Sequence, residues 1–348
     1  KLGVLAQIDL ENRNRSSHDL SARYDNAPAN LDSINSLQFL DMILTDMNRS
    51  NDRSNSLFVV DYNIQNGSIS YSGLNSKIKK NEISYSDIYA LLAEDRFYNT
   101  GEAINDINVI SETWKYEQKL LSNLSLDAFS SFSMSKNDRD NYMFSFIEQD
   151  AYSASVIKKS VDNIRNYTFN NINSAYLLNA TNRLNKTTEK ESSFGVNLEY
   201  DFNLFNKISG KIKTGFKSRD KRRDHDQNQE SLVWHSDING YPGLRDTTIN
   251  HFEWLSAIVD DSYGTQKIKY PVLRDDNYDL SNFLGGKYDI GPAADIDKLQ
   301  SIYQFARNNP IFYNASYHEN RMLKYHKTNS LIYDYDGTEN YKARYAMI

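Results

Sequence analysis

Apolar and polar residues alternate along the segment from Phe194 to Phe216, and this alternation is the clearest pattern in the chain. Every second residue from Phe194 to Phe202 is apolar, and the residues between them are small, polar or charged. After a short turn at 203–206, a second arm alternates in the same sense from Ile208 to Phe216. Because successive side chains of a strand point to opposite faces, the segment predicts a β-hairpin with one apolar and one polar face.

Further arms with this period lie elsewhere in the chain. The even-numbered residues from Leu2 to Leu10 are apolar, and comparable arms lie at about 58–71, 114–135 and 341–347. Asn66-Gly67 is a strong hairpin signal, because a type I′ turn needs a positive φ at both central residues. A two-residue turn at this position predicts that Ile64 pairs with Ile69.

The predicted strands are joined by two kinds of link that alternate along the chain. Tight turns are predicted at about 65–68, 121–123 and 203–206, and long connections at about 12–56, 76–110, 138–188 and 220–336. Short helices are predicted inside the connections after Ser36, from Ser86 to Phe97, and from Ile296 to Arg307 with Asp295 as its N-cap.

This alternation of links bears on the fold class. A soluble sheet can place one apolar face on a core, but compact soluble domains rarely contain several connections above about 12–15 residues. Outer-membrane barrels combine short periplasmic turns with long extracellular loops, and their strands face lipid on one side and a wet lumen on the other. The sequence therefore predicts an all-β segment, about eight strands of a larger antiparallel transmembrane β-barrel.

Composition narrows this interpretation further. The 348 residues include no stretch of about 18 apolar residues, so no transmembrane helix is expected, and barrel strands escape such a search because only alternate residues are apolar. A net charge of −6 argues against general nucleic-acid binding, and the lack of cysteine excludes disulfides and thiolate sites. Strand patterns run up to Lys1 and Ile348, so we expect the chain to be part of a longer protein.

Four stretches together resemble the barrel of a TonB-dependent outer-membrane receptor: residues 1–25, 57–74, 192–224 and 333–348. The resemblance covers all of the predicted strands. It implies a barrel of about 22 strands, a plug domain in the lumen and energy-coupled import of a scarce solute. No plug, TonB box or closing C-terminal strand is visible, so the chain would be an interior third of such a receptor.

In a barrel, the polar positions of the strands would line the lumen, where they could contact the plug, line a solute path or simply solvate the wall. Glu199 and Asp201 stand opposite lysines of the next strand, which predicts cross-strand ion pairs. The lumen-facing candidates are Asp9, Glu11, Asp61, Asn197, Glu199, Asp201, Lys211, Lys213, Lys342 and Arg344.

A second set of candidates lies in the longest connection and at its base. Aromatic residues there could form a solute-binding surface, or they could pack the connection on itself. The basic cluster of Arg219, Lys221, Arg222 and Arg223 could attract lipopolysaccharide or an anionic solute, or be a solvated loop base. The solute-binding candidates are Trp234, Tyr241, Trp254, Tyr263, Arg222 and Arg223.

No known catalytic or metal-binding motif accompanies these residues. The six histidines all lie in predicted connections without metal-ligand spacing, and the acidic run after Asp220 lacks the glycine of a calcium loop. We therefore predict no enzyme activity, cofactor or metal. The expected function is TonB-dependent uptake of a metal chelate, vitamin, glycan or peptide, with a surface adhesion protein or a polysaccharide hydrolase as alternatives.

The expected partners follow from the receptor resemblance. They are outer-membrane lipid and lipopolysaccharide, the TonB complex through a plug region, a surface lipoprotein and a small solute, with no nucleic acid.

Overall fold

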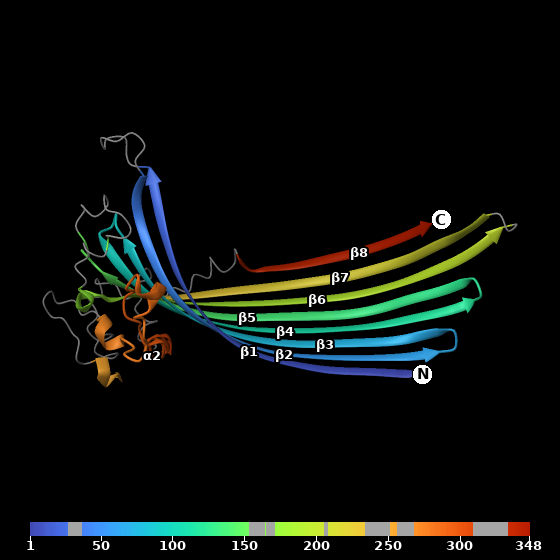
Figure 1. Cartoon of the computed structure of the whole chain (residues 1–348), viewed down its shortest axis with the longest axis horizontal. Helices are drawn as coiled ribbons and strands as arrows, with labels where there is room; N and C mark the ends of the chain where they lie inside the picture. The colour runs from blue at the N-terminus through green and yellow to red at the C-terminus, as the bar shows by residue number, and fades with distance from the viewer. Residues whose placement is uncertain are drawn as a thin grey trace.

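The computed structural model of the chain contains one antiparallel sheet of eight strands, which lie side by side in the order in which they occur in the sequence. The structure describes residues 1–26, 37–152, 164, 171–204, 208–233, 251–255, 268–308 and 333–348. Strands β1 and β8 lie at opposite edges of the sheet, which is open (Figure 1). The strands are β1 (Leu2–Asn26), β2 (Leu37–Ile64), β3 (Gly67–Ala90), β4 (Asp95–Leu121), β5 (Leu124–Glu148), β6 (Tyr176–Leu204), β7 (Ile208–Val233) and β8 (Tyr335–Met347).

The predicted all-β class and number of strands are confirmed, but the strands are much longer than the alternating apolar patterns indicate. Much of the predicted connections 12–56, 76–110, 138–188 and 220–336 is strand, and the link between β3 and β4 is only a turn at 91–94. The extra length is polar, since Asn, Ser, Lys and Asp recur where the strands continue beyond their apolar arms. A backbone ladder extends through such residues without any apolar face, so an apolar pattern marks only part of each strand.

Two of the predicted helices are wrong. Residues after Ser36 form the start of β2, and the segment from Ser86 to Phe97 forms the end of β3, a turn and the start of β4. Buried residues alternate here with a period of two, including Tyr85 and Tyr89 on β3 and Tyr98 on β4. The third predicted helix is confirmed as α2 (Ile296–Asn308), and Asp295 Oδ1 caps it by accepting hydrogen bonds from the Asp297 and Lys298 amides, both at 3.1 Å.

The hairpin between β2 and β3 turns one step earlier than predicted. Ile64 pairs with Gly67 rather than with Ile69, so Gln65 and Asn66 form the turn, and Asn66 has a positive φ of 60°. Gly67 is already in the strand, where a Cβ would overlap the Glu117 carbonyl oxygen of β4. The glycine therefore permits close approach of the backbones instead of a turn conformation. A turn is present at 122–123, within the second predicted tight turn. Of the third predicted turn at 203–206, residues 203–204 belong to β6 and the rest falls on 205–207, outside the described residues.

The sheet has two chemically different faces at the end that carries the tight turns. The pairing register places the even-numbered residues of β1 on one face with the apolar arms of β2 to β7. We call this the band face, and the other the opposite face. The apolar residues of the band face at this end form the apolar band, and its exposed members are Leu2, Val4, Ile8, Leu10, Phe58, Tyr62, Ile69, Trp114, Phe132, Phe194, Leu198, Tyr200, Ile208 and Ile212.

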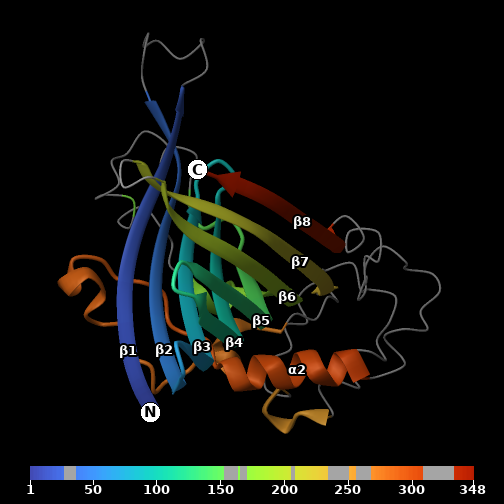
Figure 2. The ribbon, with the colours of Figure 1, turned by 90° about the vertical axis from the view of Figure 1, so that its right-hand side faces the viewer.

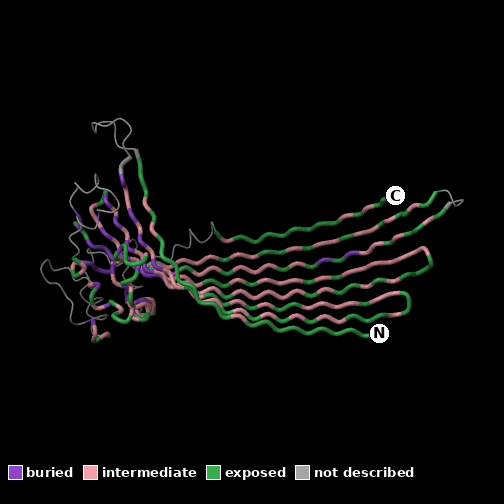
Figure 3. Tube along the Cα trace, in the orientation of Figure 1, coloured by how far each residue is buried: buried purple, intermediate pink, exposed green. Residues whose placement is uncertain are grey.

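The far end of the sheet is covered by segments that lie outside the strands. They include the short helices η3 (Ile172–Ser174), η5 (Glu253–Leu255), η6 (Tyr270–Leu273) and η7 (Phe283–Gly286), together with α2, and we call residues 171–174, 251–255 and 268–308 the loop module. Buried residues concentrate at this end (Figure 3). Two apolar cores join the loop module to the strands, one around Phe146 and Tyr303 and the other around Tyr89 and Phe283.

The helix α2 lies across several strands of the sheet (Figure 2). Gln300 contacts Glu102 of β4, Gln304 Nε2 donates a hydrogen bond to the Tyr142 hydroxyl of β5 at 2.9 Å, and Arg307 donates one to Glu230 of β7 at 3.1 Å. These three helix residues are spaced by four and three, so they share one side of α2. None of the described helices is long and apolar enough to cross a membrane.

Candidate functional site

The opposite face gathers most of the residues predicted to line a lumen. On β6 and β7, Glu199 is in register with Lys213, and Asp201 with Lys211. Asp9, Glu11, Asp61 and Asn197 occupy odd-numbered positions that the register assigns to this same face. The structure therefore brings eight of the ten candidates onto one face at the tight-turn end.

Charged residues on the opposite face are paired across strands, as predicted for β6 and β7. Lys211 contacts Glu199 closely and lies 3.7 Å from Asp201, and Lys213 lies 3.8 Å from Glu199. Each of these side chains is at least one-quarter exposed, so the pairs contribute little to stability. Their effect is to leave a polar surface of nearly balanced charge.

A similar arrangement is found near the edge strand β1. Asn55 donates a hydrogen bond to Asp9 at 3.1 Å, and Arg53 lies 3.6 Å from Glu11. Arg13 also contacts Glu11. Asp9 and Glu11 of β1 thus have partners on the same face of β1 and β2.

Lys342 and Arg344 lie on the band face instead, and their assignment to the polar set is wrong. Arg344 is in register with Phe216 and Lys342 with Ser218, so the aromatic Tyr345 falls on the opposite face. There the Tyr345 hydroxyl donates a hydrogen bond to Asn197 Oδ1 at 2.6 Å, and its ring lies where a Cβ of residue 215 would be. Because that residue is Gly215, the ring has room on the polar side.

The solute-binding candidates are not brought together among the described residues. Arg222 is on the band face, where it pairs with Asp224 at 3.2 Å and Asp336 at 3.1 Å, whereas the neighbouring Arg223 places its guanidinium 5.6 Å from the Tyr335 ring centre on the opposite face. Trp254 is half-buried against the Tyr303 core and contacts Lys298. The remaining candidates lie outside the described residues: Trp234, Tyr241 and Tyr263.

A buried ion pair that the sequence did not indicate anchors the loop module. Arg96 of β4 donates to Asp87 of β3 through Nε at 2.8 Å and Nη2 at 2.5 Å, and the Gly291 amide of the loop module donates to the same carboxylate at 3.0 Å. Burial alone would lower the pKa of the Arg96 guanidinium, but the charge and hydrogen bonds of Asp87 raise it well above its usual range. The guanidinium also lies 4.6 Å and 4.8 Å from the ring centres of Tyr89 and Tyr98.

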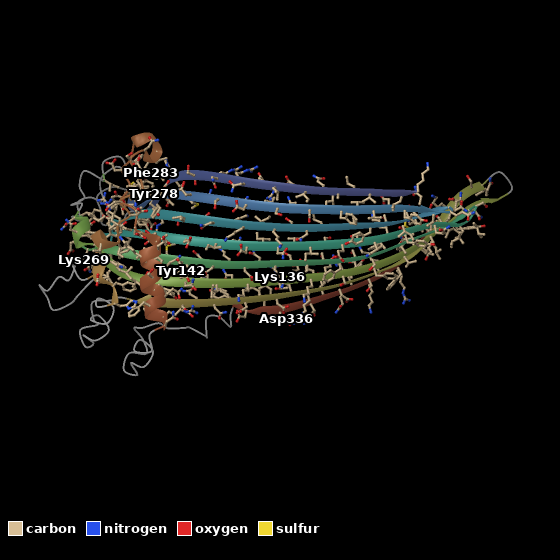
Figure 4. All side chains as sticks on the ribbon, turned by 90° about the horizontal axis from the view of Figure 1, so that it is seen from below. Lys136, Tyr142, Lys269, Tyr278, Phe283 and Asp336 are labelled. Carbon is tan, nitrogen blue, oxygen red and sulfur yellow. The ribbon has the colours of Figure 1, made fainter. Side chains whose placement is uncertain are left out.

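A second polar anchor joins β1 and β2 to the loop module. Tyr278 donates its hydroxyl to Asp46 at 2.5 Å, and burial and that carboxylate raise the pKa of Tyr278. His18 Nε2 lies 3.1 Å from Asp46, while His18 Nδ1 accepts the Leu284 amide at 3.0 Å. His18 and His225 are strand residues, which corrects their expected place in connections. Figure 4 shows Tyr278, Phe283 and Tyr142 together at the loop-module end.

Both anchors and both cores use the band face. Asp46, Asp87, Tyr98, Tyr142 and their in-register neighbours carry the loop module on the same side of the sheet as the apolar band. The aromatic residues of the described loop segments therefore serve as packing cores on that side. The polar surface around Glu199 and Lys211 is on the other side of the sheet.

Within the described residues, no group of three or more His, Cys, Asp or Glu side chains is arranged to hold a metal ion. Comparison with known proteins finds no matching family model, no matching curated protein and no matching solved structure. The exposed apolar band and the charged opposite face are therefore the features of the described residues that bear on function.

Proposed function

We propose that this sheet is part of the wall of an outer-membrane β-barrel, and that the complete protein is an active-transport receptor of the TonB-dependent kind. The observation that carries the proposal is the exposed apolar band, opposed across the sheet by a charged, ion-paired face. Contiguous exposed apolar surface of this extent marks an interaction site in soluble proteins. In a barrel wall, the apolar band would contact lipid and the charged opposite face would contact water, so neither surface would be in an unfavourable solvent.

The length of the apolar band along the strands agrees with the thickness of a membrane. On β6 it runs from Phe194 to Phe202 and on β7 from Ile208 to Phe216, about nine residues each, and a tilted barrel strand needs about 9–11 residues to cross a bilayer. Beyond these residues the strands continue as polar segments. The same strands would therefore cross the membrane and extend well outside it.

The upper edge of the band, on the side toward the loop module, is also lower on β7 than on β1. Through the successive pairings, Phe216 of β7 is level with Leu2 of β1, but the apolar positions of β1 continue to Leu10, about eight residues farther. At about 3.3 Å per residue and 4.8 Å per strand, this offset over six strand steps corresponds to a tilt of about 40°. Ile110 on β4 and Met134 on β5 stand above the line from Leu10 to Phe216, and Phe58 on β2 and Tyr71 on β3 stand below it, so the slope is set by the two outer strands. Its value agrees with the 35–45° tilt typical of membrane barrels.

The transported solute would be captured outside the membrane and pass through a lumen lined by the opposite face. That face is polar and charged around Glu199, Asp201 and Lys211, as a wet lumen around a plug requires. The proposed solute classes are a metal chelate, vitamin, glycan or peptide. The proposed partners in transport are the TonB complex, reached through a plug, and a surface lipoprotein.

A substitution on each face tests the membrane assignment. Leu198→Arg places a charge in the apolar band and should cost about 2–4 kcal/mol if it faces the bilayer midplane, so recovery in the outer membrane should fall sharply. The matched control is Ser125→Arg on the opposite face, where Ser125 is in register with Glu199 and a new arginine would face water in the proposed lumen. Loss of both variants from the outer membrane, or recovery of the wild-type full-length protein as a soluble species without detergent, would refute the proposal and favour a surface adhesion protein or a polysaccharide hydrolase.

A further inference from the structure

The band face changes its chemistry in steps from the tight turns toward the loop module. Beyond the apolar band, this face carries lysine, asparagine and aspartate on β3 to β5, whereas asparagine and serine predominate on β1 and β2 and reach Asn81 of β3 before the loop module begins. Asn14, Ser50 and Asn81 are in register in that last zone, and they line a hollow of about 370 Å³. This sequence of surfaces matches the acyl chains, phosphates and sugars of a phosphorylated glycolipid.

The charged step contains a second and larger hollow of about 580 Å³. Lys77 of β3, Asn108 of β4 and Lys136 of β5 line it and are directly in register with one another. Asn108 and Lys136 are the first band-face residues beyond Ile110 and Met134, so this row stands at the upper boundary of the apolar band. Figure 4 shows Lys136 midway along the sheet, away from the loop module.

The two lysines are available to bind an anion. Both side chains are exposed, and neither has an ion pair among the described residues. Asp52, Asp106 and Asp138, which also line the hollow, lie in the next row away from the band, together with Lys79. A phosphate at the boundary of the band therefore meets Lys77 and Lys136 first, with the Asn108 amide able to donate a hydrogen bond between them.

We propose that Lys77, Asn108 and Lys136 form a binding site for a phosphate of a phosphorylated glycolipid in the outer leaflet. The proposal rests on the membrane placement of the apolar band. The acyl chains would lie against the band, the phosphate would bind the two ammonium groups, and the sugars would contact the asparagine and serine zone. The loop module on the same face would stand above these headgroups.

The test uses the full-length protein in mild detergent and measures its affinity for bisphosphorylated lipid A and for the same lipid without phosphates. The variant Lys77→Gln/Lys136→Gln should bind lipid A roughly tenfold more weakly than the wild type, as expected for loss of charge-assisted hydrogen bonds to phosphate. The matched control is Lys80→Gln/Lys115→Gln, which removes two exposed lysines from the opposite face and should leave the affinity unchanged.

Two outcomes would contradict the proposed phosphate-binding site. Equal weakening in the two double variants would show that only overall charge matters, and equal binding of the lipid without phosphates would exclude phosphate recognition. Outer-membrane recovery of the wild-type protein is measured in the same cells. If the protein is membrane-embedded and either outcome occurs, only the glycolipid site is wrong, whereas a detergent-independent soluble protein would contradict the transport proposal as well.

Discussion

Arg96 and Asp87 form a two-point hydrogen-bonded ion pair between β4 and β3, and both side chains are almost completely buried under the loop module. The pair also receives the Gly291 amide, so one buried carboxylate connects two strands and a distant part of the chain. Removing one member of such a pair leaves a buried charge without compensation.

Asp87→Ala should therefore destabilise the loop-module end of the protein by about 3–5 kcal/mol. Limited proteolysis of residues 268–308 and thermal unfolding of the full-length protein measure the effect. The double variant Asp87→Leu/Arg96→Met, which removes both charges, should recover much of the loss. Asp61→Ala, at an exposed carboxylate of the opposite face, should change the free energy of unfolding by less than about 0.5 kcal/mol.

Gly67 should tolerate no side chain, because a Cβ at this position would overlap the backbone oxygen of Glu117. Gly67→Ala is expected to lower the free energy of unfolding by about 1–3 kcal/mol by pushing β3 and β4 apart. Gly337→Ala is the matched substitution, since nothing lies within 4 Å of a Cβ built there. Similar unfolding temperatures for the two variants would argue against the observed approach of β3 and β4.

The pairing of β8 can be tested with engineered cysteines, since the chain contains none of its own. The register places Phe216 opposite Arg344, and Ala343 opposite Lys217. Phe216→Cys/Arg344→Cys should form a disulfide readily on mild oxidation, and Phe216→Cys/Ala343→Cys should not. The reverse result would show that Lys342 and Arg344 lie on the opposite face, as predicted from the sequence alone.

The sequence predicts an element correctly where its local pattern of apolar and polar residues is compatible with only one secondary structure. The alternation of apolar and polar residues around Leu198 and Ile212 is enough to predict strands β6 and β7. Asp295 is a typical N-cap residue, and the apolar residues that follow it recur with the helical period of 3.6, which is enough to predict α2. Prediction fails where a distant contact decides the structure. The segment from Ser86 to Phe97 resembles a helix until its alternate residues are buried by loop residues near Gly291.

The same distinction applies to the candidate site. The ion pairs of Glu199 with the lysines of β7 could be predicted, because a tight hairpin fixes their register. The face of Arg344 could not, because it depends on Tyr345 fitting over Gly215 and reaching Asn197 on a strand more than one hundred residues away. The pair of Asp87 and Arg96 lacks any local signal, since its burial comes from the loop module.

A cysteine scan of β6 from Phe194 to Phe202, in the full-length protein in lipid vesicles, tests most directly whether the apolar band faces lipid. Each single cysteine carries a spin label, and its accessibility to membrane-dissolved oxygen is compared with its accessibility to a water-soluble nickel chelate. If the apolar band faces lipid, accessibility should alternate strictly along β6. Oxygen should reach the positions of Phe194, Val196, Leu198, Tyr200 and Phe202, and the nickel chelate should reach the positions between them. Labels that are all reached by the nickel chelate, or even-numbered labels that neither reagent reaches, would contradict a lipid-facing band.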